Sequence, residues 1–207
     1  LNGLFKLVLV GKHANRNVVL RFGLPALAAA LIGAWLLTLL SDLPALATYE
    51  LFGRGISILP IKLVIGVLLL AFTLMEALPR VRDMEFEPKY LPIGGAISGF
   101  FGGLSGHQGA LRAAFLAKTG LSKEAFVGSS TVIACMVDVA RLGQYARDWS
   151  EHGATLDYTL LTVAVLAAFA GSMIGNFYLK KLTMIGIQRL VTVMLFAIAV
   201  GLIAGWI

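Results

Sequence analysis

The sequence predicts an all-α, polytopic membrane protein. Of its 207 residues, 58% are hydrophobic and only 14% are charged, whereas a soluble domain carries about 25% charged residues. The apolar residues form several runs close to the roughly 20 residues that a helix needs to cross a bilayer. The connections between these runs are too short to fold as separate domains. We therefore expect one transmembrane domain, 1–207.

The formal net charge of +6 does not indicate nucleic-acid binding in such a chain. Most basic residues lie in short loops between apolar runs, where they favour the cytoplasmic side. The single cysteine, Cys135, lies inside an apolar run, which excludes a disulfide framework and a cysteine metal site. The sequence contains no GxxxxGK[ST], HExxH or GxSxG motif, so neither an enzyme nor ATP-driven transport by this chain is indicated. We expect no metal and no cofactor.

The ordinary membrane helices are expected in apolar windows that follow one another along the chain. Each window is long enough, or nearly so, to span the hydrocarbon core. The chain opens with Leu1 in an apolar stretch that resembles the end of a helix already under way, so we expect further residues upstream. The predicted helices are 22–40, 57–78, 124–146, 157–179 and 187–207.

Residues 91–118 form an apolar segment of a different kind, with a glycine every few residues and polar side chains at its middle. In hydrocarbon an unpaired backbone group costs several kcal/mol, so a broken helix requires protein or water around its open ends. We expect half-helices at about 92–105 and 109–118 that enter from the cytoplasmic side and return, with the tip near His107. Two short complete crossings would satisfy the same loop charges.

A weak internal repeat divides the chain. LPIKLVIGVLLLAF at 59–72 resembles IGIQRLVTVMLFAI at 185–198, and the helix 22–40 overlays 157–179. Matching loops carry opposite charge, which is expected for repeats of inverted topology. The basic loop 6–21 matches the acidic 147–157, and the acidic 41–56 matches the basic 180–189. The predicted parts are an incomplete first repeat, 1–78, a cytoplasmic linker, 79–90, and a second repeat, 91–207.

Two interpretations apply to the glycine-rich segment. Gly95, Gly99 and Gly103 follow one another at intervals of one helical turn, which is typical of closely packed membrane helices. A helix that restarts at Gly109 also presents free N–H groups and about half a positive charge at its first turn, which favours an anion. Arg112 would add a full charge one turn further, unless its side chain extends to the lipid headgroups.

The candidate substrate-binding residues lie at this break and at the start of the next helix. Hydroxyl groups there could bind oxyanions or return a hydrogen bond to their own helix. A histidine at the tip is either a structural hydrogen-bonding group or a proton carrier. The predicted residues are Gly106, His107, Gln108, Gly109, Arg112, Ser129, Ser130 and Thr131.

A second set of residues is expected to line the cavity or to couple transport to an ion. Asp138 and Arg141 lie one turn apart on the polar face of the helix 124–146, where they could pair. Charged groups inside a membrane are usually functional, although a structural pair near the outer interface is the alternative. Asn2 and Lys6 align with this face in the repeat overlay and could line the opposite wall.

The stretch GGAISGFFGGLSGHQGALRAAFLAKTGLSKEAFVGSSTVIACMVDVARL resembles the TauE/SafE sulfite exporter family, also called the toluene-sulfonate uptake permease family (TSUP). The resemblance implies a bacterial inner-membrane transporter of two inverted halves, coupled to an ion gradient. It implies organosulfur compounds, sulfite-like oxyanions or small organic acids as substrates. The family commonly has a GxGGG cluster at the break. Here His107 and Gln108 stand between two glycines, which should narrow the site or change its ligand.

The resulting prediction is a secondary transporter that moves a small anion by alternating access, with the substrate near the tip of the broken helix. An anion channel and a non-transporting membrane scaffold or assembly factor stay open as alternatives. The expected partners are the small anion and the lipid bilayer. A proton or a sodium ion as the coupling ion, and a homodimer, also stay open.

Overall fold

The computed structural model describes residues 7, 8, 10–51, 53–78, 85–152, 159, 162–167, 169–171 and 184–206. Within them, two helices are long and apolar enough to cross a membrane, Arg16–Ser41 and Lys123–Arg147, and shorter apolar helices include Pro60–Met75 and Arg189–Ile203. Large apolar side chains lie on the outside, with Val139, Leu142 and Val193 about two-thirds exposed. Such a surface suits contact with lipid rather than with water.

The first long helix begins at Arg16, nearly two turns before the predicted residue 22. The Asn15 side chain accepts a hydrogen bond from the N–H of Val18 at 3.2 Å and caps α2, Arg16–Val18. A π-helical turn, Val19–Gly23, then leads into α3, Leu24–Ser41. Pro25 explains this turn, because proline lacks an N–H and its ring would clash with the carbonyl group one turn earlier.

The remaining helices agree largely with the predicted windows, but several boundaries differ. The helix predicted at 124–146 continues to residue 152, since its polar last turns form a helix without contributing to the apolar window. The predicted helix 157–179 lies mostly outside the described residues. The helices are α4, Pro60–Ala77; α6, Leu91–Ser105; α7, Gly109–Leu116; α8, Lys123–His152; and α10, Met184–Ile203.

The chain is mostly helical, as predicted, but the expectation of an all-α protein is wrong between α3 and α4. There β1, Ala47–Leu51, pairs antiparallel with β2, Arg54–Ile58, across a turn that contains Gly53 with φ +72°. β-branched residues in the strands and a glycine in the turn favour such a hairpin. The predicted helix 57–78 therefore begins only at residue 60, because the hydropathy window did not separate the strand from the helix.

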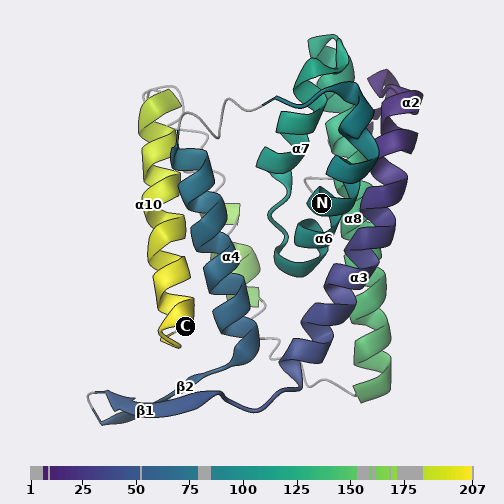
Figure 1. Ribbon diagram of the computed structural model, residues 1–207. Coiled ribbons are helices and arrows are strands. Elements are labelled where there is room, and N and C mark those ends of the chain that lie inside the picture. Colours follow the sequence, from purple (N-terminus) through teal and green to yellow (C-terminus); the bar gives the residue numbers. More distant parts are fainter. Residues whose placement is uncertain are drawn as a thin grey trace.

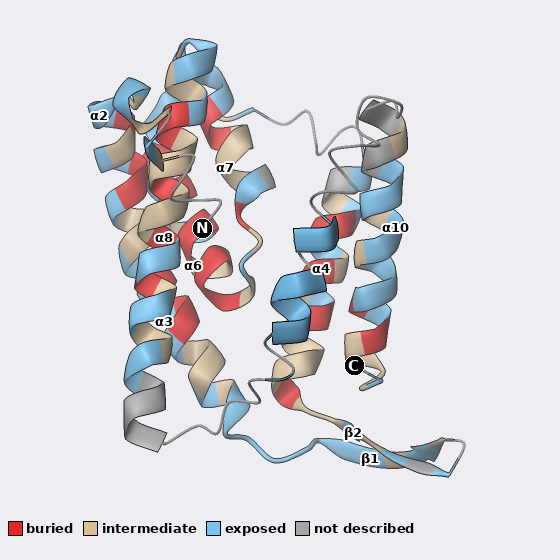
Figure 2. Ribbon diagram, turned by 180° about the vertical axis from the view of Figure 1, so that it is seen from behind, coloured by how far each residue is buried: buried red, intermediate tan, exposed pale blue. Residues whose placement is uncertain are grey.

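The helices form two groups, as Figure 1 shows. In one group α6 packs against α3 and α8, and in the other α4 packs against α10. The buried residues concentrate where α3, α6 and α8 meet, whereas the outward faces of α4 and α10 are exposed (Figure 2). Fully buried side chains of this core are Phe22, Leu116, Ile133 and Val137.

The glycine stripe of α6 allows its close contact with α3. A methyl group on each of these glycines would overlap the backbone of α3 or of the π-helical turn before it, at the carbonyl oxygens of Phe22, Ala26 and Ala30 for Gly95, Gly99 and Gly103. The close approach also requires a glycine on α3, because a methyl group on Gly33 would overlap the carbonyl oxygen of Phe100 in α6. The packing interpretation of the stripe is thus confirmed, and α6 lies against α3 with backbone facing backbone.

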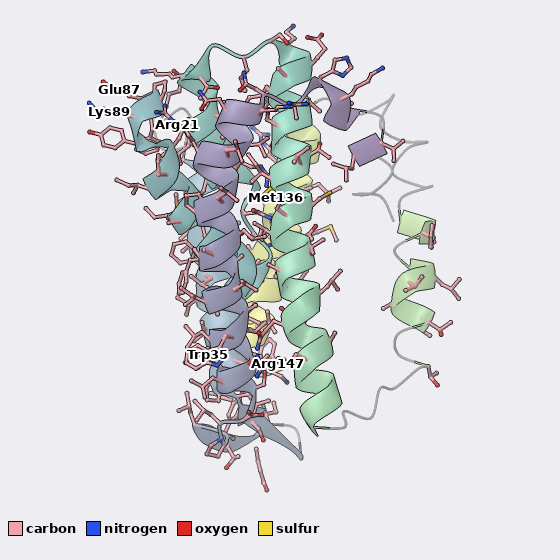
Figure 3. The ribbon with its side chains drawn as sticks, turned by 90° about the vertical axis from the view of Figure 1, so that its right-hand side faces the viewer. Arg21, Trp35, Glu87, Lys89, Met136 and Arg147 are labelled. Carbon is pink, nitrogen blue, oxygen red and sulfur yellow. The ribbon has the colours of Figure 1, made fainter. Side chains whose placement is uncertain are left out.

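The labelled residues identify the two ends of the molecule. Figure 3 shows Arg21, Glu87 and Lys89 at one end and Trp35 and Arg147 toward the other. The first end also holds the exposed Lys118, which lies 3.8 Å from Glu85.

Candidate functional site

The chain reverses direction between α6 and α7 at a glycine in a left-handed conformation. Gly106 has φ +79° and its N–H donates to the carbonyl oxygen of Gly102 at 2.9 Å. The Ser98 hydroxyl donates to the carbonyl oxygen of Gln108 at 3.3 Å. The open ends of this antiparallel hairpin lie at the same end of the molecule (Figure 1). We call residues 105–109 the tip.

A second row of glycines on α6 makes room for the returning segment. A methyl group on Gly94 would overlap the ring of Phe115 in α7. At Gly102 a Cβ would lie 3.1 Å from the Cβ of Gln108. The glycines of α6 therefore serve two contacts at once, because one row faces α3 and the other faces the returning segment and α7.

The outer side of α7 is covered by residues of the predicted linker. The Phe86 N–H donates to the carbonyl oxygen of Ala114 at 3.2 Å, and its ring stacks on that of Phe115 with centroids 4.2 Å apart. The sequence analysis did not include Phe86. The sequence nevertheless contains a signal for this contact, because Phe86 is an aromatic residue between two glutamates in a mostly polar loop.

Arg112 connects the hairpin to α8. Its Nε donates to the hydroxyl of Ser130 at 2.8 Å, which brings together two of the predicted site residues. Its Nη1 is buried and has no hydrogen-bond partner in the described structure. A buried guanidinium N–H without an acceptor is costly in the absence of a ligand and is a strong donor for an oxyanion.

The first turn of α7 adds further donors near Arg112. The first helical bond runs from the Arg112 N–H to the Gln108 carbonyl at 3.0 Å, so the N–H groups of the preceding helical residues have no partner within α7. No side chain caps this helix. The glycine at its start, Gly109, is exposed and has no atom within 4 Å of the position that a Cβ would occupy.

Asp138 and Arg141 do not form the predicted pair in the part of the chain that the structure describes. Asp138 is exposed and interacts electrostatically with Arg112. Arg141 instead donates through Nη2 to the Tyr145 hydroxyl at 3.2 Å, and its guanidinium lies 5.6 Å from the centre of that ring. The position of Tyr145, one turn after Arg141, was the sequence signal for this contact.

The remaining predicted residues take different positions. Ser129 is fully buried, and its hydroxyl accepts a hydrogen bond from the Asn15 N–H at 2.9 Å, so it supports the cap of α2. Thr131 and His107 are partly buried, and the His107 N–H donates to the Ser105 hydroxyl at 3.4 Å. Asn2 and Lys6 lie outside the described residues.

Among the described residues, no group of three or more His, Cys, Asp or Glu side chains could hold a metal ion. Near the tip and on α8, the buried side-chain atoms without a hydrogen-bond partner in the described structure are two donors, Arg112 Nη1 and Arg141 Nε, and one acceptor, Gln108 Oε1.

Comparison with known proteins gives one match. A family model described as sulfite exporter TauE/SafE matches residues 2–202, nearly the whole chain. No curated protein and no solved structure matches the chain.

Proposed function

The chain belongs to the sulfite exporter TauE/SafE family, and on this premise we propose that it is a secondary transporter of small sulfur-containing anions or similar oxyanions. The substrate binds where the tip of the α6–α7 hairpin meets α8. The hairpin enters a bacterial inner membrane from the cytoplasmic side and returns to it. Access alternates between the two faces as one repeat moves against the other.

The unpaired donor of Arg112 is the observation that carries this proposal. Its Nε is fixed by Ser130, which leaves the buried Nη1 without an acceptor. The start of α7 offers free backbone N–H groups nearby. One oxyanion could accept from both, and it would compete with Asp138 for the positive charge of Arg112.

The arrangement of α4 and α10 supports inverted repeats. These helices contain the two segments that resemble each other in sequence, and they run side by side in opposite directions (Figure 1). Opposite directions are what an inverted repeat requires of matching helices. A Cβ on Gly66 of α4 would lie 2.9 Å from the carbonyl oxygen of Ala199 in α10, so the two helices are also closely packed.

Transport in proteoliposomes tests the proposal, with sulfite and methanesulfonate as probes. Arg112→Gln should lower uptake at low substrate concentration at least about tenfold, since a hydrogen bond from a charged group is worth roughly 1.5–3 kcal/mol. The matched control is Lys118→Gln, which removes an exposed positive charge near the end of the same hairpin and should leave uptake unchanged. Unchanged uptake by Arg112→Gln would exclude this site. Uptake that does not saturate would indicate a channel instead.

A further inference from the structure

Arg141 meets the tip of the hairpin from α8. Its Nη1 lies 2.9 Å from the position that a Cβ of Gly106 would occupy, so the guanidinium lies directly against the glycine that reverses the chain. Tyr145 holds the other terminal nitrogen, Nη2. The remaining donor, Nε, is buried and has no hydrogen-bond partner within the described structure.

Arg112 of α7 and Arg141 of α8 bind partners at different heights along α8. Arg112 is bound to Ser130, whereas Arg141 is directed toward Tyr145, one turn further along α8. Residues 130 and 141 are about 16 Å apart along the axis of an α-helix. The partners of the two guanidinium groups on α8, Ser130 and Tyr145, are about four helical turns apart. Each guanidinium nevertheless keeps one buried N–H group without an acceptor.

We propose that Arg141 and Tyr145, where they lie beside Gly106, form a second binding site for a small oxyanion. We call it the outer station, and the Arg112–Ser130 site the inner station. The outer station lies nearer to the end of α8 that carries Arg147 (Figure 3). This inference rests on the proposed function, because it assigns a second stop to the same anion. Binding there places the anion against the tip, whose glycines allow the backbone to adjust.

The order of the charged residues along α8 favours two binding sites that an anion would occupy one after the other. Asp138 lies between Ser130 and Arg141 in the chain and interacts electrostatically with Arg112. It would separate the two stations with a negative charge and keep an anion from passing freely. Each station presents a positive charge, and the oxyanion supplies the acceptor that the unpaired guanidinium N–H requires.

The number of methanesulfonate ions bound per chain tests this proposal. We would measure it by equilibrium dialysis of the purified full chain in a phospholipid-free, non-ionic detergent. The wild type should bind two ions, Arg141→Gln one, Arg112→Gln one, and the double variant none. Lys123→Gln, at the exposed start of α8, is the matched control and should bind two. Two ions bound by Arg141→Gln, or a single ion bound by the wild type and retained by Arg141→Gln, would overturn the outer station.

Milder variants keep the test decisive if Arg141→Gln does not fold. Tyr145→Phe retains the guanidinium but removes the hydroxyl that orients it, and should weaken only the second binding event, by about three- to tenfold. An equal weakening of both events would contradict a separate station. Phosphatidylglycerol distinguishes a lipid headgroup from a free anion: if it abolishes the second event while a zwitterionic lipid does not, the site holds lipid and the proposal is wrong.

The two proposals fail in different ways. Loss of binding in Arg141→Gln, with no effect of Arg112→Gln, would leave the outer station standing and remove the inner one. Loss in Arg112→Gln alone would remove the outer station and leave the proposed function intact.

Discussion

Arg112 and Ser130 join the returning arm of the hairpin to α8 through a 2.8 Å hydrogen bond between Nε and the hydroxyl oxygen. The bond fixes the direction of the guanidinium, so that Nη1 is held without an acceptor of its own. The neighbouring hydroxyl, that of Ser129, is used differently, because it accepts from the Asn15 N–H. Adjacent serines therefore have separable roles.

Replacement of these serines should separate binding from stability. Ser130→Ala should raise the KM for sulfite in proteoliposomes by about three- to tenfold, since one oriented hydrogen bond is lost. Ser129→Ala should leave KM unchanged and lower the thermal stability in detergent, because the Asn15 N–H loses its acceptor in the fully buried Ser129 hydroxyl. Equal effects of both substitutions on KM would contradict this assignment.

A side chain at Gly99 should destabilise the protein. Gly99→Ala places a methyl group against the backbone of Ala26, and overpacking of this kind costs about 1–3 kcal/mol. Thermal unfolding followed in detergent should therefore begin at a clearly lower temperature. Gly109→Ala is the matched control, as nothing lies within 4 Å of its Cβ position. It should leave the unfolding temperature unchanged or raise it, because alanine favours the helix.

Labelling with a membrane-impermeant maleimide should reveal the orientation. In a Cys135→Ala background, Lys123→Cys should react only after the cells are permeabilised, since basic ends face the cytoplasm. Thr48→Cys, on the exposed β1 strand, should react in intact cells. The reverse pattern would show that the hairpin enters from the other side, whereas labelling of both in intact cells would contradict the proposed crossing of α3.

Tyr49→Phe should loosen the β-hairpin. The hydroxyl donates to the carbonyl oxygen of Ala204 and accepts from Trp206 Nε1 at 3.1 Å, which ties β1 to the end of α10. Loss of about 1 kcal/mol should raise amide hydrogen exchange in β1 and β2 about fivefold. Tyr90→Phe, at an exposed ring on the opposite end, should leave this exchange unchanged.

Much of the helical arrangement could be predicted, because membrane helices are marked by composition. The glycines and polar residues of 91–118 placed the break within one residue of Gly106 and Gly109. The β-hairpin was missed because its short strands merge with the apolar run that follows. The π-turn depends on Pro25 inside an apolar run, where sequence alone does not determine how the helix accommodates the proline.

The sequence predicts candidate site residues, but it does not predict which of them pair. Arg112 and Ser130 were both expected, but only the fold brings them within hydrogen-bonding distance. Asp138 and Arg141 were expected to pair from their spacing, yet Arg141 lies against the tip and donates to Tyr145, one turn further along its own helix. Spacing on one helix specifies which groups can meet, whereas neighbouring helices decide which do.

The two glycine rows of α6 restrict how this part of the chain can change in length. An inserted or deleted residue rotates everything beyond it by about 100°. A single such change between Gly94 and Gly103 would turn side chains toward α3 and toward α7 at the same time. Related chains with a longer or shorter first arm should therefore differ by about a whole helical turn, and they should keep both rows aligned.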